Sequence, residues 1–163
     1  MPRKLVGGLI RAAAPIADPS VPIDKIRKAA IDAHIPFIEE AGKRGVQILG
    51  LEEIFNGPYF CPSQDAHWYD IAEPVPGPTC ELMAQYARKY QMAMVVPVYE
   101  REAPGIYYNT AAVYDADGTY LGKYQESHPA YVGFLGEVLL QARQPGVSGV
   151  SDALCQGRRL YLL

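Results

Sequence analysis

The sequence predicts an α/β domain in which strand-like and helix-like segments alternate. Two apolar runs, residues 5–13 and 46–55, have the length and continuity of buried strands. Two segments, residues 21–45 and 77–91, carry apolar residues at helical spacing. Three more strand-like segments follow, which gives the order β-α-β-α-β-β-β and a layered α/β arrangement. We find no internal repeat in the sequence and no linker long enough to divide the chain into two domains.

The first predicted helix follows a turn at residues 19–22. Ile23, Ile26 and Ile38 recur at helical spacing, and Gly42 or Gly45 is the expected stop signal. Pro36 lies inside this pattern, so we expect a kink or a break there. The second helix begins at Pro78 and Thr79 and is expected to bury Leu82, Met83, Tyr86 and Ala87. Residues 115–118, Asp-Ala-Asp-Gly, predict a hairpin turn between the last two strands.

Composition excludes several classes of function. With 163 residues, 49% of them hydrophobic and 20% charged, the chain fits one soluble domain. A net charge of -3 gives no basic surface for nucleic acid, so a small neutral or anionic molecule is the expected partner. The first apolar run is too short and too interrupted to span a membrane.

Cysteine and histidine spacing argues against disulfides and metals. Three cysteines, an odd number without a CxxC pair, indicate a reducing cytoplasmic location. The three histidines stand far apart along the sequence, at positions 34, 67 and 128. We therefore expect neither a zinc site nor a disulfide framework.

Two carboxylates, Glu52 and Glu53, end the second apolar run. Successive strand side chains face opposite sides, so one carboxylate can point inward while the other points away. A carboxylate there is costly unless it is paired, and a raised pKa would make it a usable general base. The alternative interpretation is a solvated strand end that happens to be acidic.

Four stretches together resemble the N-terminal half of the nitrilase superfamily of carbon-nitrogen hydrolases. They are "ILGLEEIFNGPYFC", "AEPVPGPTCELMAQYARKYQMAMVVPVYERE", "GIYYNTAAVYDADGTYLGKY" and the degraded "SHPAYVGF". Within the superfamily the likeness is nearest to β-ureidopropionase and related N-carbamoyl amidases. The resemblance implies half of a four-layer α-β-β-α sandwich, homo-oligomers, and hydrolysis of an N-carbamoyl amino acid such as N-carbamoyl-β-alanine without a metal or organic cofactor. Another amidase branch, acting on N-carbamoylputrescine or an ω-amide, or a non-catalytic binding module, remains an alternative.

The resemblance assigns the general base to Glu53. Its family partners are an oxyanion-stabilising lysine in a "GKYRKxHIP" pattern and a nucleophilic cysteine in a later "ICYD" strand. Glu126 stands at the lysine position, preceded by Gln125 where arginine is usual. Lys123, in the "GKY" element, is expected to be structural and to point elsewhere on its strand.

Neither the lysine nor the nucleophilic cysteine of the family pattern is found in this sequence. Cys155 lies in "ALCQGRR", which is not flanked like the nucleophile strand, and Cys61 and Cys80 are expected to be packed thiols. We therefore expect the chain to be inactive. Aromatic residues of the loop after Glu53 are expected either to shape a substrate pocket or to provide plain packing: Phe55, Tyr59, Phe60 and Trp68. Tyr107, Tyr108 and Asn109 match the family's "YNT" strand and are expected to be structural.

The chain changes character near Gly136, so we expect a hydrolase region over residues 1–135 and an aberrant tail over 136–163. The tail lacks Lys, Ile, Asn, Met, Thr and Phe and shows no core periodicity. Codons can be chosen for the tail so that, after one base of the Gly136 codon is dropped, another reading frame spells "ERFYFRPGNLGYPVFQTRFARVGVYICY". This string resembles the sequence that the family has at this place, up to its nucleophile strand. We interpret the tail as a frameshift. An N-terminal half alone would leave strand edges and an apolar sheet face uncovered, which favours aggregation.

Overall fold

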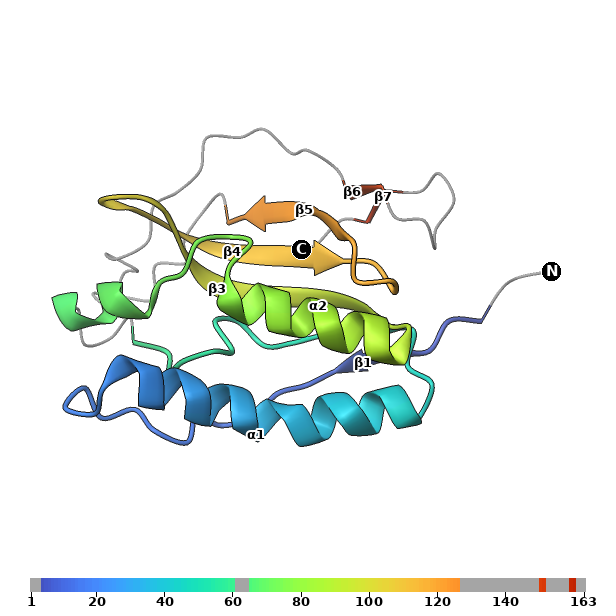
Figure 1. Ribbon diagram of the computed structural model, residues 1–163, viewed down its shortest axis with the longest axis horizontal. Coiled ribbons are helices and arrows are strands. Elements are labelled where there is room, and N and C mark those ends of the chain that lie inside the picture. The colour runs from blue at the N-terminus through green and yellow to red at the C-terminus, as the bar shows by residue number, and fades with distance from the viewer. Residues whose placement is uncertain (1–3, 61–64, 127–149, 152–158, 161–163) are drawn as a thin grey trace, which may run out of the picture.

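The computed structural model describes residues 4–60, 65–126, 150–151 and 159–160. Five strands form one sheet in the order β1-β2-β3-β4-β5 (Figure 1). Their bounds are β1 Gly7–Leu9, β2 Ile48–Gly50, β3 Ala93–Ala103, β4 Ile106–Tyr114 and β5 Tyr120–Gln125. Strands β1, β2 and β3 are parallel to one another, and β4 is antiparallel to both β3 and β5. Two short strands, β6 (Val150–Ser151) and β7 (Arg159–Leu160), pair with each other.

Two helices, α1 (Ile23–Lys43) and α2 (Pro78–Tyr90), cover the same face of the sheet (Figure 1). The helices supply part of the main hydrophobic core, and β3 and β4 supply the facing residues. On β3 these are Met94, Val96 and Val98, which alternate with the half-buried Val95 and Pro97 on the opposite face. The period-2 alternation of the strand thus separates a helix-covered face from a face that the described residues leave open.

The predicted break at Pro36 is wrong. Helix α1 continues through this residue from Ile23 to Lys43 and buries His34, Ile38 and Ala41 around it. Packing of this face against the sheet therefore outweighs the hydrogen bond that proline cannot donate. Gly42 is required for the contact between the two helices, because a Cβ there would lie 2.3 Å from the ring of Tyr90.

The β-rich half of the chain agrees closely with the sequence prediction. Helix α2 begins at Pro78, and it buries Met83 and Ala87 while Leu82 and Tyr86 are only partly buried. The hairpin between β4 and β5 turns at Gly118, which has a φ of 82° and donates its N–H to the Asp115 carbonyl at 2.9 Å.

The parallel strands are shorter than predicted, and this changes where the two adjacent carboxylates lie. Strand β2 ends at Gly50, so Glu52 and Glu53 belong to the connection that follows it rather than to the strand end. Ile54, the next residue, is buried in the left-handed conformation with a φ of 49°. This conformation is rare for a β-branched side chain and holds only where surrounding packing fixes it.

A second hydrophobic cluster covers this connection. It joins Ile54 to Phe60, to Trp68 of the 3₁₀ helix η2 (Ala66–Ile71), and to Tyr99 of β3. The ring centroids of Phe60 and Tyr99 lie 4.9 Å apart. The aromatic loop is therefore largely a packing element.

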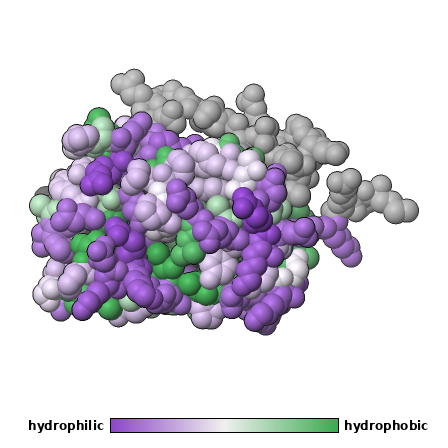
Figure 2. Space-filling model, viewed as in Figure 1, coloured by the Kyte–Doolittle hydropathy of each residue, from purple (hydrophilic) through white to green (hydrophobic). Residues whose placement is uncertain are grey.

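The helix-covered face is polar toward solvent. Figure 2 shows hydrophilic residues over most of it, with hydrophobic residues in small separate areas. No helix within the described residues is long and apolar enough to cross a membrane. The larger exposed apolar side chains include Leu5, Val6 and Leu9 at the β1 edge, and Leu9 is 90% exposed.

Candidate active site

Glu53 stands three residues beyond the carboxyl end of the parallel strand β2. In open α/β sheets, ligands bind outside the carboxyl ends of parallel strands. The side chain of Asn109, on β4, donates a hydrogen bond from Nδ2 to Glu53 Oε1. The chain therefore brings the proposed base onto the open face of the sheet.

Glu126 lies beside Glu53, and the two carboxylates share the side-chain amide of Asn109. Asn109 Nδ2 also donates to Glu126 Oε2 at 2.9 Å, and the Glu126 N–H donates to the Asn109 carbonyl at 2.9 Å. One amide nitrogen thus bridges two carboxylates from different parts of the sequence. Position 126, where the resemblance places a lysine, is next to the proposed base, but it carries the same charge as that base.

This arrangement raises the pKa of Glu53 above its ordinary value. Loss of hydration is the largest cause and the neighbouring charge of Glu126 adds to it, while the Asn109 hydrogen bond opposes both. Although Glu53 is exposed on its solvent side, apolar residues of the open sheet face displace part of the water around its carboxylate. A carboxylate of this kind retains its proton to higher pH and is a better proton acceptor once ionised.

An open cavity of about 870 Å³ lies in front of the two carboxylates. Its floor is the uncovered sheet face, and most of its lining is apolar. The lining residues are Leu5, Gly7, Gly8, Leu9, Ile48, Gly50, Leu51, Glu53, Val95, Pro97, Asn109, Ala111, Tyr124 and Glu126. Such a concave, mostly apolar site with a few convergent polar groups suits a small molecule.

Lys123 is on the other face of the sheet, as the sequence predicted. The alternation of β5 sends Tyr124 and Glu126 toward the cavity and Lys123 and Gln125 toward the helices. There Lys123 Nζ pairs with Glu100, which is 1% exposed and also accepts hydrogen bonds from Thr110 Oγ1 and Gln125 Nε2. This ammonium is held in a buried structural network and does not face Glu53.

Glu52 is turned toward α1 rather than toward the cavity. Its Oε1 accepts a hydrogen bond from the Ala12 N–H at 3.1 Å and lies 3.1 Å from His34 Nε2. The two adjacent carboxylates thus have different surroundings, and Glu53 is the one that lines the cavity.

The aromatic candidates do not line this cavity. Phe55 and Phe60 are buried in the two hydrophobic clusters, Trp68 is buried with Phe60, and Tyr59 is 54% exposed. A role for Phe55, Tyr59 or Phe60 in substrate binding remains a prediction.

Cys80 is the one cysteine within the described residues, and it lies on the helix side of the sheet. It is buried, and loss of hydration raises the pKa of its thiol to about 11. A thiol held protonated in this way is a poor nucleophile, which agrees with its predicted packing role. Cys61 and Cys155 lie outside the described residues.

Asn109 is the site residue that the sequence did not single out. The sequence predicts a structural role for the "YNT" strand. The alternation along β4 is the signal that indicates that Asn109 faces away from the helices, unlike Thr110. Within the same described ranges, no three His, Cys, Asp or Glu side chains come together as a metal site would require.

Comparison with known proteins agrees with this architecture. The family model described as carbon-nitrogen hydrolase matches residues 24–159. A β-ureidopropionase of Arabidopsis thaliana is 32% identical over 139 residues, which cover 83% of this chain and 34% of that protein. An N-carbamoylputrescine amidase of rice, Oryza sativa subsp. japonica, is 37% identical over 99 residues, or 60% of this chain and 33% of that protein. The chain thus spans about a third of the length of these relatives.

Solved structures share the fold. A carbon-nitrogen hydrolase from Helicobacter pylori G27 superposes with a TM-score of 0.79 at 22% identity, covering 92% of this chain and 49% of that one. An amidase from Nesterenkonia sp. AN1, solved with acrylamide, gives a TM-score of 0.61 at 22% identity over 98% of this chain and 55% of that one. The sheet and its two covering helices therefore correspond to about half of a nitrilase-type fold, and the chain belongs to the carbon-nitrogen hydrolase family.

Proposed function

We propose that this chain carries the base-bearing half of an active site for hydrolysis of an N-carbamoyl amino acid, such as N-carbamoyl-β-alanine. The observation that carries the proposal is Glu53, which lies at an open cavity with its pKa raised by its surroundings. The β-ureidopropionase and N-carbamoylputrescine amidase names of two relatives support a carbamoyl substrate. Hydrolysis would release the amino acid, ammonia and carbon dioxide.

In the proposed mechanism, Glu53 accepts the proton of a cysteine thiol as the sulfur attacks the carbamoyl carbon. The tetrahedral intermediate places a negative charge on the former carbonyl oxygen, and a neighbouring ammonium group would stabilise that charge. Collapse of the intermediate expels one of the two nitrogen groups on the carbamoyl carbon, ammonia or the amino acid, with a proton returned from Glu53. Water then releases the remaining carbamoyl group from sulfur as a carbamic acid, which decomposes to carbon dioxide and the other amine. Asn109 would hold the Glu53 carboxylate in place during these steps.

We further propose that the chain as it stands is inactive. Glu126 occupies the position beside Glu53 where the mechanism requires a positive charge, and a carboxylate there would repel the developing oxyanion. Lys123 cannot replace it from the opposite face, and the buried Cys80 thiol is on that face as well. We retain the hypothesis that residues 136–163 are the family's gene read in another frame, which the DNA across codons 120–170 would test.

Ammonia release tests the proposal. We expect no release from N-carbamoyl-β-alanine with the present chain. We expect release with a repaired chain, in which Glu126→Lys is combined with the other reading frame continued past codon 163. Turnover by the present chain that Cys155→Ser abolishes would contradict the proposed inactivity, and a folded repaired chain without turnover on any carbamoyl substrate would contradict the proposed reaction.

A second candidate is another amidase branch. The 37% identity to the N-carbamoylputrescine amidase favours a cationic carbamoyl substrate, and an ω-amidase of Xenopus laevis is 32% identical over 119 residues. Relative rates of the repaired chain on N-carbamoyl-β-alanine, N-carbamoylputrescine and an ω-amide would separate these branches. Ligand binding by the present chain without turnover would instead favour a non-catalytic module, which the carboxylate at Glu126 supports.

A further inference from the structure

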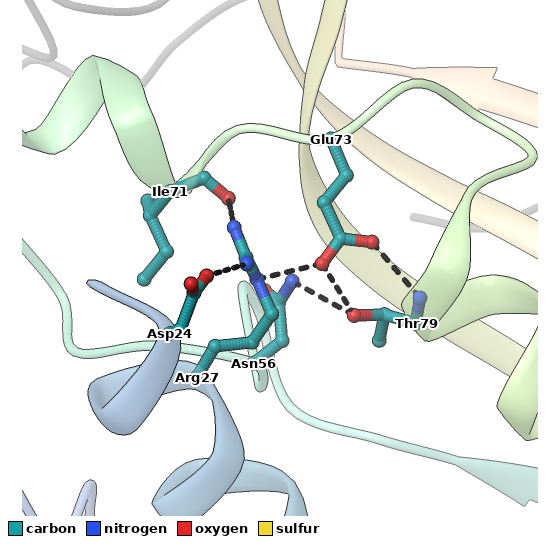
Figure 3. Close-up of polar contacts among 6 residues, drawn as sticks. All are labelled: Asp24, Arg27, Asn56, Ile71, Glu73 and Thr79. Carbon is teal, nitrogen blue, oxygen red and sulfur yellow. Dashed lines mark hydrogen bonds and ion pairs between the residues drawn. The ribbon is translucent and has the colours of Figure 1, made fainter. Parts of the chain in front are cut away.

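A buried polar network lies behind the turn that carries Glu53. At its centre is Glu73, which is 5% exposed. Its carboxylate accepts hydrogen bonds from the Thr79 N–H at 2.9 Å and from Thr79 Oγ1 at 2.6 Å, and it pairs with Arg27 Nε at 2.7 Å (Figure 3). Buried charges require such partners, so the three groups form one unit whose members depend on each other.

Arg27 extends this unit to the first turn of its own helix and to η2. Its Nη1 donates to Asp24 Oδ1 at 3.2 Å in the first turn of α1, and its Nη2 donates to the Ile71 carbonyl at 3.0 Å at the end of η2 (Figure 3). Thr79 stands in the first turn of α2, where a carboxylate is also favoured by the helix dipole. The network therefore fixes α1, η2 and the start of α2 relative to one another.

The turn after Glu53 is attached to the same network. Asn56 is fully buried and donates from Nδ2 to Thr79 Oγ1 over 3.5 Å. The turn is closed by the Gly57 N–H, which donates to the Ile54 carbonyl at 3.1 Å. Gly57 packs so closely on Ile71 that a Cβ there would lie 2.4 Å from the Ile71 side chain. The turn thus contacts both Thr79 and the residue whose carbonyl binds Arg27.

This attachment supports an otherwise unfavourable backbone. Ile54 has a φ of 49°, a conformation that costs free energy and persists only where neighbouring contacts enforce it. Ile54 directly follows Glu53 and lies two positions before Asn56. A change in the turn would therefore change the direction of the Glu53 carboxylate relative to Asn109.

We propose that Glu73 is a positioning residue for Glu53: it holds Thr79 and Arg27, and through them the turn 54–57 that aims the Glu53 carboxylate at Asn109. The inference rests on the proposed role of Glu53 as general base for its relevance to catalysis. The position of the Glu53 carboxylate can be measured in the present chain without any turnover. Glu73 itself does not line the cavity and would not touch substrate.

The test uses Thr79→Val, Thr79→Ser and Glu73→Gln in the full chain. Valine keeps the shape of threonine but removes the hydroxyl link between Asn56 and Glu73, whereas serine keeps that link. The first measurement is the carboxyl ¹³C titration of Glu53, assigned with Glu53→Gln. The second is hydrogen exchange of the peptide that contains the Gly57 N–H.

We expect the Glu53 pKa to fall toward its ordinary value in Thr79→Val and Glu73→Gln, and to be retained in Thr79→Ser. Exchange at the turn should accelerate about tenfold, the factor that corresponds to the loss of one buried hydrogen bond. Glu100→Gln is the matched control, because Glu100 is also buried and paired with a cation, but its side-chain partners are Lys123, Thr110 and Gln125 instead of Arg27 and Thr79. It should destabilise the chain without moving the Glu53 titration.

An unchanged Glu53 titration in folded Thr79→Val would overturn the inference, and so would an equal change in Glu100→Gln. If Glu73→Gln does not fold, the valine and serine pair decides alone. Failure of the proposed function would look different: Glu53→Gln would leave turnover of the repaired chain intact, whatever the titration of Glu53 shows in the Thr79 variants.

Discussion

Replacing Glu126 with lysine should reverse the electrostatic environment of Glu53. In the present chain, Asn109 Nδ2 donates to both carboxylates, and the charge of Glu126 is one cause of the raised Glu53 pKa. A lysine at this position would place an ammonium group near the same carboxylate. The pKa of Glu53 should then fall, because an adjacent positive charge favours the ionised form.

The size of the effect follows from the geometry. Two acceptors of one amide nitrogen lie about 5 Å apart at ordinary hydrogen-bond lengths. Unit charges at that separation interact by about 1 kcal/mol in water and about 3 kcal/mol at an effective dielectric constant of 20. Because Glu53 is exposed on its solvent side, the smaller value applies. Changing repulsion into attraction should therefore change the free energy of ionising Glu53 by about 2 kcal/mol.

The assay is the carboxyl ¹³C titration of Glu53 in the parent chain, Glu126→Gln and Glu126→Lys. Glutamine removes the charge but keeps the shape and is the matched control, so it should produce about half of the lysine effect. Equal titration curves for Glu53 in all three folded proteins would refute the assignment of position 126 to the neighbourhood of the base.

Three further predictions concern stability and reactivity. Because folding raises the pKa of Glu53, this group's stabilising contribution is present below the ordinary pKa of 4.5 and is lost as the pH rises through the raised pKa. Glu53→Gln should therefore be more stable than the parent above this pH range but not below it. Urea unfolding of both proteins above and below the range would show this. In a chain that carries Cys61→Ser and Cys155→Ser, the remaining Cys80, with a thiol pKa of about 11, should resist alkylation at pH 8. Rapid labelling of the folded chain, measured by mass spectrometry, would contradict the burial of this thiol. Gly42→Ala should lower the free energy of unfolding by about 1–3 kcal/mol because its Cβ would overlap the Tyr90 ring. If the double variant Gly42→Ala/Tyr90→Ala loses as much free energy of unfolding as the two single variants together, or more, that contact is not the cause.

The sequence predicted the elements whose patterns have a local physical cause. Helix α2 has proline at its first position, and the β4–β5 turn has glycine where a positive φ is required. The structural role of Lys123 was expected from its place in the "GKY" element, and the structure pairs it with Glu100. These features depend on neighbours along the chain, so sequence patterns report them well.

Other features depend on contacts between distant segments. The continuity of α1 through Pro36 is decided by packing on the sheet, which no local rule contains. The left-handed Ile54 is held by partners from η2 and β3. Asn109 joins Glu53 to Glu126 only because β4 lies between the β2 connection and the end of β5. Such features require the fold before they can be seen.

The central claim is that Glu53 is the proton acceptor for a thiol nucleophile in a site that Glu126 disables. The most direct test is the rate of ammonia release from N-carbamoyl-β-alanine by the repaired chain with and without Glu53→Gln. Loss of a positioned general base should lower the turnover rate by about 10²–10⁴-fold while the variant remains folded. A folded Glu53→Gln variant with an undiminished rate would contradict the claim.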